Sequence, residues 1–187
     1  TDYIYVSHEH PDHFSPGFFF NKEYKAILEK NKTKILFQET KDKRVFDFLV
    51  KNGFEVIEVP NKKYITLKNS VKIKIVKFGY IDSALIIEGS KDKILNLNDC
   101  PLNDIDEIRK FKNAHGKFDL LLTQFSYAAW KGNEDNQGYR QNAASDKLKT
   151  LINQFNILNC KKVIPFASFI YFSNKLNKFM NDEINKP

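Results

Sequence analysis

Short apolar runs and segments of helical periodicity alternate along the chain. Between residues 71 and 76, valine or isoleucine alternates with lysine, which predicts a strand with one buried face and one face in water. Other short runs rich in β-branched and aromatic residues predict strands at 3–6, 34–37, 54–59, 64–67, 84–87, 94–97, 118–122 and 163–166. Gly89-Ser90-Lys91-Asp92 lies between two of these runs and is typical of a hairpin turn.

Helix signals separate several of these strands. Ser15-Pro16 combines a capping residue with a proline suited to the first helical turn, and Gly53 is placed as a C-terminal stop. These signals and the apolar spacing predict helices at 18–30, 42–52 and 104–112.

The clearest helix begins at Ser145. Its apolar residues recur at helical spacing: Leu148, Leu151, Ile152, Phe155 and Leu158. We interpret this face as ordinary core packing. The preceding residues, 131–142, are polar, contain two glycines and have no period, which predicts a long exposed loop of the kind that often carries function.

The order of these elements favours a layered α/β sandwich, because strands stand before and after helices with a hairpin in the middle. The 187 residues and 42% hydrophobic content suffice for one compact domain with a core, over residues 1–187. No internal repeat or linker interrupts the sequence.

The net charge of +7 is carried mainly by lysine. Readers of nucleic-acid phosphates favour the bidentate fork of arginine, and the chain has only Arg44, Arg109 and Arg140. We therefore expect a solvated lysine surface, a small-molecule substrate and no nucleic-acid partner.

The sequence also bears on location and redox state. No stretch approaches the roughly 18–20 apolar residues of a membrane span, and the first residues have no signal-peptide pattern. A cytoplasmic protein without membrane contact is expected. Cys100 and Cys160 lie far apart and form no Cys-x-x-Cys pair, so reduced thiols are expected.

Three of the four histidines fall within the run His8-Glu9-His10-Pro11-Asp12-His13, at the end of the first strand. Residues two apart on a strand point the same way, so His8 and His10 can face one cation. Imidazole and carboxylate groups are ordinary ligands of zinc and non-haem iron. The alternative is a polar surface loop whose histidines only cap backbone groups. Four ligand-type residues in six favour a metal site over that alternative.

This run resembles the histidine motif of the metallo-β-lactamase superfamily. The resemblance implies metal ligation by His8, His10, Asp12 and His13. The segment Ile94-Leu95-Asn96-Leu97-Asn98-Asp99-Cys100 looks like the strand of that family that ends in a metal-bridging aspartate, and Asp99 is the matching position. A turn aspartate before Pro101 is the alternative interpretation of Asp99.

Within the superfamily, the sequence is similar to the lactamase-like domain of CMP-N-acetylneuraminate hydroxylase and its bacterial relatives. The similarity rests on the histidine run, the strand ending at Asp99, residues 121–130, and residues 164–169 with the tail 181–185. It implies a four-layer αββα sandwich and, in the hydroxylase, an accompanying Rieske iron–sulfur domain. The chain has no Cys-x-His and Cys-x-x-His pair, so a Rieske centre would lie outside it.

The chain departs from the two-metal pattern of the superfamily. That pattern includes one histidine between the first motif and the bridging aspartate, and another near the C-terminus. Asp82 could replace the first as an oxygen ligand or could be a plain carboxylate at the start of a strand, and Ser173-Asn174 stands near the second. His115 fits the C-terminus of a helix, where a protonated imidazole suits the helix dipole. One Zn or Fe ion is therefore expected rather than two.

The superfamily normally has a strand-rich segment before the histidine motif, whereas His8 stands near the first residue here. We therefore expect a fragment or truncated member lacking its N-terminal strands, with a partner chain or the missing segment covering the sheet.

The leading functional hypothesis is a metal-dependent hydrolase in which a metal-bound water attacks an ester, amide or phosphoester, and Asp12 orients that water or accepts its proton. Two alternatives remain. One is a domain of a Rieske-type nucleotide-sugar hydroxylase system, and the other is a binding module with a vestigial metal site. Tyr127, Trp130 and Phe169 could stack on a base or sugar, although core packing is the favoured interpretation.

Overall fold

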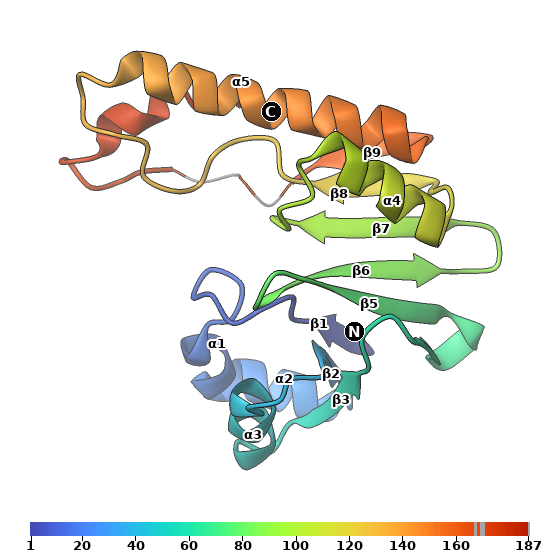
Figure 1. The fold of residues 1–187 in the computed structure, drawn as a ribbon. Helices are drawn as coiled ribbons and strands as arrows, with labels where there is room; N and C mark the ends of the chain where they lie inside the picture. Colours follow the sequence, from blue (N-terminus) through green and yellow to red (C-terminus); the bar gives the residue numbers. More distant parts are fainter. Residues whose placement is uncertain (167, 169–170, 187) are drawn as a thin grey trace. The chain divides into compact units, whose positions relative to one another are not determined.

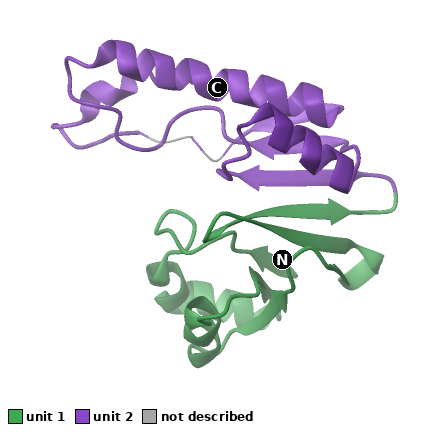
Figure 2. Cartoon of the chain, viewed as in Figure 1, with its two compact units in different colours: residues 1–90 green, residues 91–187 purple. Residues whose placement is uncertain are grey.

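The computed structural model describes residues 1–166, 168 and 171–186 (Figure 1). The chain divides into two compact units, Thr1–Ser90 and Lys91–Pro187 (Figure 2). The first unit contains the histidine run. The expectation of one domain over the whole chain stays a prediction.

The first unit opens with a parallel sheet in which β2 is the central strand. Its elements are β1 (Tyr3–Tyr5), α1 (Pro16–Phe20), α2 (Lys22–Lys30), β2 (Lys34–Gln38), α3 (Arg44–Lys51) and β3 (Glu55–Val59). Tyr3 pairs with Lys34, and Lys34 in turn pairs with Glu55. The helices stand between the strands in sequence, as parallel pairing requires.

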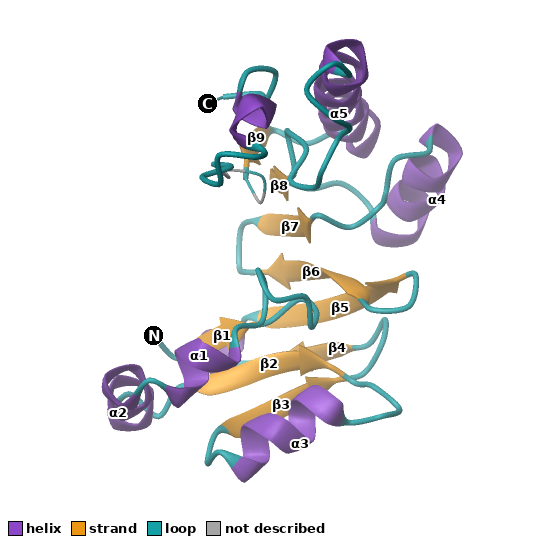
Figure 3. Ribbon diagram, turned by 90° about the vertical axis from the view of Figure 1, so that its left-hand side faces the viewer, coloured by secondary structure: helices purple, strands orange, loops and turns teal. Residues whose placement is uncertain are grey.

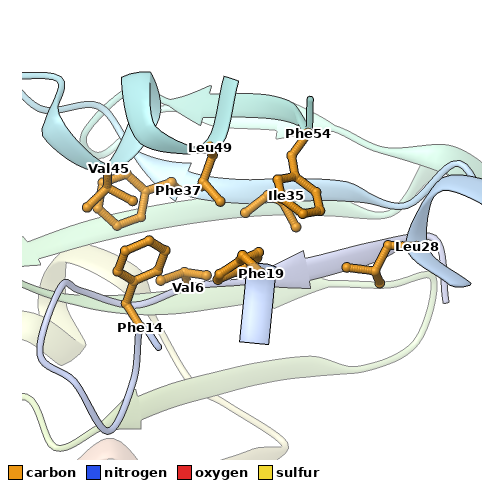
Figure 4. Close-up of a cluster of buried hydrophobic side chains, with 9 residues drawn as sticks. All are labelled: Val6, Phe14, Phe19, Leu28, Ile35, Phe37, Val45, Leu49 and Phe54. Atoms are coloured by element: carbon orange, nitrogen blue, oxygen red, sulfur yellow. The ribbon is translucent and has the colours of Figure 1, made fainter. Parts of the chain in front are cut away.

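Strand β2 is buried on both faces, which explains its uninterrupted apolar run. Ile35 and Phe37 pack with side chains of the helical layer, and Figure 4 shows them with Phe14, Phe19 and Leu49. Leu36 belongs to a second cluster formed with strands of an antiparallel sheet. Because side chains alternate along a strand, one strand contributes to both cores.

The antiparallel sheet of the first unit consists of β4 (Tyr64–Thr66), β5 (Lys72–Phe78) and β6 (Asp82–Glu88), with a 3₁₀ turn η1 (Lys68–Ser70) between the first two. Ile73 and Ile75 are buried, which confirms the predicted alternation. The β5–β6 hairpin pairs Phe78 with Asp82. Gly79 adopts φ +52° in this tight connection, a conformation that glycine reaches without strain. The first unit is thus layered as helices, parallel sheet and antiparallel sheet (Figure 3).

The second unit contains parallel strands and two long helices. Its elements are β7 (Lys93–Asn98), α4 (Ile105–His115), β8 (Leu120–Thr123), α5 (Gln137–Leu158), β9 (Lys162–Pro165) and the 3₁₀ turn η2 (Lys178–Asn181). Ile94 pairs with Leu120, which pairs with Lys162. Ile108 of α4 and Leu158 of α5 are buried, as predicted. The core-packing interpretation of the α5 face was wrong for Leu148 and Ile152, which are exposed, because α5 buries Ala144 and Gln154 instead.

Two predicted helix boundaries were wrong. The segment predicted as one helix over 18–30 is divided at Asn21, whose side chain accepts hydrogen bonds from the backbone N–H groups of Glu23 and Tyr24 and so caps a new helix. Helix α5 begins at Gln137, within the segment predicted as a loop. Its first turns lack apolar periodicity because a buried charged residue, Arg140, holds them in place.

Cys100 and Cys160 are buried, and neither forms a disulfide within the described residues. Burial raises the pKa of the Cys160 thiol to about 11. Within the described residues, no helix combines the length and hydropathy needed to cross a membrane.

Candidate metal site

The histidine loop is anchored at both ends. The backbone N–H of Val6 donates to the carbonyl of Leu36, which extends the β1–β2 pairing to the residue before Ser7. At the other end, Phe14 is buried in the helix-side core, and its N–H donates to the carbonyl of His10 at 2.7 Å. The ligand-type residues therefore lie on a short loop whose ends are fixed by pairing and packing.

His8 and His10 lie together, as their spacing predicts. His8 Nε2 is 2.9 Å from His10 Nδ1, and the two rings meet edge to face. His8 is only 1% exposed, whereas His10 is exposed and His13 is partly buried. The His13 ring centroid lies 4.2 Å from that of His8. A buried imidazole is thus surrounded by two more accessible ones.

Asp82 completes the cluster from the antiparallel sheet. Its Oδ1 lies 3.8 Å from His8 Nε2, and the candidate ligand atoms of His8, His10 and Asp82 all lie within 4.8 Å of one another. The hairpin pairing of Phe78 with Asp82 fixes the start of β6, so the carboxylate is held by strand register. The sequence left two roles open for Asp82, and its position supports the role of a ligand.

The donor set of this cluster fits one metal ion. Zinc binds imidazole nitrogens at about 2.0–2.1 Å, which places neighbouring ligand atoms of a tetrahedral site about 3.3 Å apart. The distances from His8 Nε2 to His10 and Asp82, 2.9 and 3.8 Å, lie on either side of that value. Two imidazoles and a carboxylate suit zinc or non-haem iron, and three protein ligands leave a position for water.

The hydroxyl of Ser7 contacts the Nδ1 atoms of two histidines of the run. Ser7 Oγ lies 3.0 Å from His8 Nδ1 and 3.3 Å from His13 Nδ1. Hydrogen bonds to the ring nitrogen that does not bind the metal fix the tautomer and orientation of a ligating histidine. Ser7 is buried, so it can act as this partner for both rings.

Gln38 and Ser83 connect the histidine loop to the start of β6, where Asp82 lies. Gln38 Nε2 donates to the carbonyls of Ser7 and Ile81, the residues immediately before His8 and Asp82. Ser83 Oγ donates to the same Ser7 carbonyl at 2.6 Å. These buried side chains come from β2 and β6, so their role depends on strand pairing that the sequence pattern did not reveal.

The remaining acidic residues of the histidine run have other surroundings. Asp12 is 71% exposed, and its Oδ2 lies 3.4 Å from His13 Nε2. Glu9 Oε1 accepts from Arg44 Nη2 at 2.7 Å, which engages this carboxylate in an ion pair. Asp12 therefore lies beside His13, and its roles as ligand and proton acceptor stay predictions. Glu9 is not part of the ligand cluster formed by His8, His10 and Asp82.

Two other predicted residues lie in the second unit. Asp99 follows β7 directly, after the positive-φ residue Asn98, and remains a predicted ligand. His115 ends α4 before Gly116, as predicted, and its ring packs against Phe111.

The aromatic residues considered for stacking differ in their surroundings. Tyr127 is buried, and its hydroxyl donates to the Met180 carbonyl, so core packing is the correct interpretation. Trp130 is exposed, and Phe169 lies outside the described residues.

Comparisons with known proteins bear on the fold. No protein family model and no curated protein sequence matches the chain. The structure is similar to CmlA, a diiron β-hydroxylase from Streptomyces venezuelae, with 15% identity and a TM-score of 0.60 over 89% of this chain and 35% of CmlA. It is also similar to the metallo-β-lactamase fold protein YhfI from Bacillus subtilis, with 14% identity and a TM-score of 0.59 over 97% of this chain and 71% of YhfI. For the short form of human tRNase Z the identity is 14% and the TM-score 0.54, over 90% of this chain and 77% of tRNase Z.

The chain thus spans about a third of the length of CmlA. YhfI is described as a metallo-β-lactamase fold protein, and at these identities the likeness to all three neighbours bears on fold alone. The fold class predicted from the histidine run is confirmed: the chain has the metallo-β-lactamase fold.

Proposed function

We propose that this chain binds one Zn or Fe ion through His8, His10 and Asp82 and hydrolyses a small ester, amide or phosphoester. The convergence of these three side chains at one buried imidazole carries the proposal. His13, Asp12 and Asp99 remain further predicted ligands. The expectation of a cytoplasmic protein with a small-molecule substrate belongs to the same proposal.

The chemistry follows from the donor set. A bound metal ion lowers the pKa of a coordinated water toward neutrality and so supplies a nucleophile. His8, His10 and Asp82 would hold the ion, and Ser7 contacts the imidazole of His8 at Nδ1 and so fixes its orientation. Asp12, which stands beside His13 at the exposed side of the loop, would orient such a water and accept its proton.

The Asp12→Asn variant tests this mechanism. The amide keeps the size of the side chain but cannot accept a proton as the carboxylate does. We expect turnover to fall about 100-fold, because a positioned general base typically contributes 100-fold or more, with metal content unchanged. Initial rates on ester, amide and phosphoester substrates measure turnover, and elemental analysis measures metal content. Asp135→Asn, at an exposed position of the second unit, is the control; unchanged turnover in Asp12→Asn removes Asp12 from the mechanism.

Ser7→Ala tests the support behind the histidines. Loss of the hydroxyl frees the Nδ1 atoms of His8 and His13, and removal of such an outer partner typically costs about 10–100-fold in metal affinity. We expect a loss in that range, measured by competition with a chelator of known affinity. Ser126→Ala removes an equally buried hydroxyl, one that accepts from the Asn185 N–H in the second unit, and should leave metal affinity unchanged. Equal affinity in wild type and Ser7→Ala contradicts the assigned role.

A second candidate function is supported by the likeness to CmlA. That protein is a diiron β-hydroxylase, and the likeness covers 89% of this chain. In this alternative the chain is one domain of an oxygenase system such as the CMP-N-acetylneuraminate hydroxylases, with an iron site here and a Rieske centre elsewhere. Iron that copurifies with the protein, together with a neighbouring Rieske sequence, distinguishes it from the hydrolase. Metal below about a tenth of an equivalent at neutral pH, even after zinc or iron is added, supports a non-catalytic binding module instead.

A further inference from the structure

A pocket of about 290 Å³ lies within the first unit, next to the metal-ligating residues. Glu9, which lines it, stands between His8 and His10 in sequence, and Ile81, which also lines it, precedes Asp82. Gln38 forms another part of the wall and donates to the carbonyl of Ile81. The pocket and the candidate metal site therefore share a loop and a hairpin, so a ligand in one lies close to the other.

The acidic side chains of the pocket are already engaged. Arg44 donates from Nε to Asp42 and from Nη2 to Glu9, both at 2.7 Å. The hydrogen bond from Arg44 holds the pKa of the Asp42 carboxyl below its usual value, so this side chain stays ionised. One guanidinium thus pairs with both carboxylates, and these three groups together keep one negative charge, which the two lysines of the pocket outweigh.

Two lysines of the pocket have no such acidic partner. Lys41 and Lys77 line it, and neither forms an ion pair within the part of the chain that the structure describes. The ammonium group of Lys77 donates to the carbonyl of Glu39, which fixes its position and leaves two further donors. The pocket therefore carries an excess of positive charge suited to an oxyanion.

The rest of the lining combines two polar residues, Gln38 and Thr40, with apolar and aromatic side chains. Phe37 provides a buried aromatic wall, and Ile81 lies beside it in the lining. Tyr80 is 90% exposed on the tight β5–β6 connection. An aromatic ring exposed at a pocket can stack on a planar ligand. A ligand that matches both the two lysines and the aromatic side chains of the pocket is an anion with an apolar or aromatic body.

We propose that this pocket binds the oxyanionic group of a small aromatic or apolar substrate, a carboxylate or phosphoester, through Lys41 and Lys77, with Tyr80 packing on its body. The proposal deepens the proposed function, because it assigns the substrate class of the same site. The pocket shares the loop of His8 and His10 through Glu9, so the proposal places the substrate next to the candidate metal site.

The test uses the full, metal-loaded chain and four probes: phenyl phosphate, inorganic phosphate, benzoate and neutral benzyl alcohol. Titration calorimetry on Lys41→Gln and Lys77→Gln should show the affinity for an anionic probe falling about 10-fold in each, since a hydrogen bond to a charged group is worth roughly that factor. Benzyl alcohol should bind much more weakly to wild type than the anions. The better of the two anions identifies the oxyanion.

Lys72→Gln is the matched control, because Lys72 is an exposed lysine on the same strand as Lys77 and does not line the pocket. Tyr80→Ala should weaken phenyl phosphate and leave inorganic phosphate unchanged. Metal content, measured on every variant, separates this proposal from the metal site. If no metal binds while the lysine variants still weaken the anions, the pocket is supported and the hydrolase is not. If metal binds but the anions do not bind, or bind equally to Lys72→Gln and Lys77→Gln, the pocket assignment is overturned.

Discussion

Replacing His8 by alanine is expected to abolish tight metal binding, with a loss in zinc affinity greater than the roughly 100-fold upper range for an outer-shell partner. His8 is the buried member of the cluster, and its Nε2 atom lies close to ligand atoms of both His10 and Asp82. Its removal leaves only the imidazole of His10 and the carboxylate of Asp82 in this cluster, fewer than the three protein ligands of a zinc site. Chelator competition gives the affinity, and elemental analysis after gel filtration gives the retained metal.

His115→Ala provides the matched control for this experiment. It removes the same side chain from the last turn of α4 in the second unit, and His115 joins no cluster of metal-ligating side chains within the described residues. Metal affinity should match wild type. Retention of one equivalent of metal by His8→Ala, at unchanged affinity, contradicts the assignment of the centre to His8, His10 and Asp82.

The part of the site that could be predicted is local in sequence. His8 and His10 come together because they are two residues apart at the end of a strand, and this geometry requires no knowledge of the fold. Asp82 lies far along the chain, and its approach depends on the hairpin register of β5 and β6. Gln38 was missed for the same reason, because a single glutamine at the end of an apolar strand gives no signal until β1 and β2 are paired.

The fold shows a similar division. The alternation of lysine and isoleucine in β5 was predicted correctly because one buried face imposes a period. The apolar spacing of α5 located the helix but not its buried face, because Arg140, Ala144 and Gln154 are buried while Leu148 and Ile152 are exposed. The boundary at Asn21 required recognition of a side-chain cap inside an apolar segment. The start of α5 was missed because its first turns contribute a buried arginine to the packing instead of apolar residues.

That buried arginine leads to the second large expected effect. Arg140 Nε donates to Glu183 Oε2 at 2.7 Å, and the two side chains are only 3% and 6% exposed. Arg140 also donates to the carbonyls of Asn133 and Glu134, and its guanidinium lies over the ring of Phe179. One side chain thus joins α5 to the preceding loop and to the C-terminal segment.

The Glu183→Ala variant is expected to lower the free energy of unfolding by about 3–5 kcal/mol, because it leaves a buried guanidinium without its counter-charge. Urea denaturation followed by fluorescence measures the change, since Trp130 is the only tryptophan and reports on the second unit. The double variant Arg140→Met, Glu183→Leu should lose less stability than Glu183→Ala, because no unpaired charge then remains buried.

An exposed ion pair on the same helix gives the contrast that tests this explanation. Lys149 and Asp146 are both 69% exposed and 3.2 Å apart, so Lys149→Ala should change stability by less than about 1 kcal/mol. Glu183→Ala and Lys149→Ala each remove one partner of an ion pair in the second unit. The difference between their losses of unfolding free energy therefore measures the cost of leaving a buried charge unpaired. A loss in Glu183→Ala as small as that in Lys149→Ala, or a double variant less stable than the single one, contradicts the view that a compensated buried charge holds the start of α5 in place.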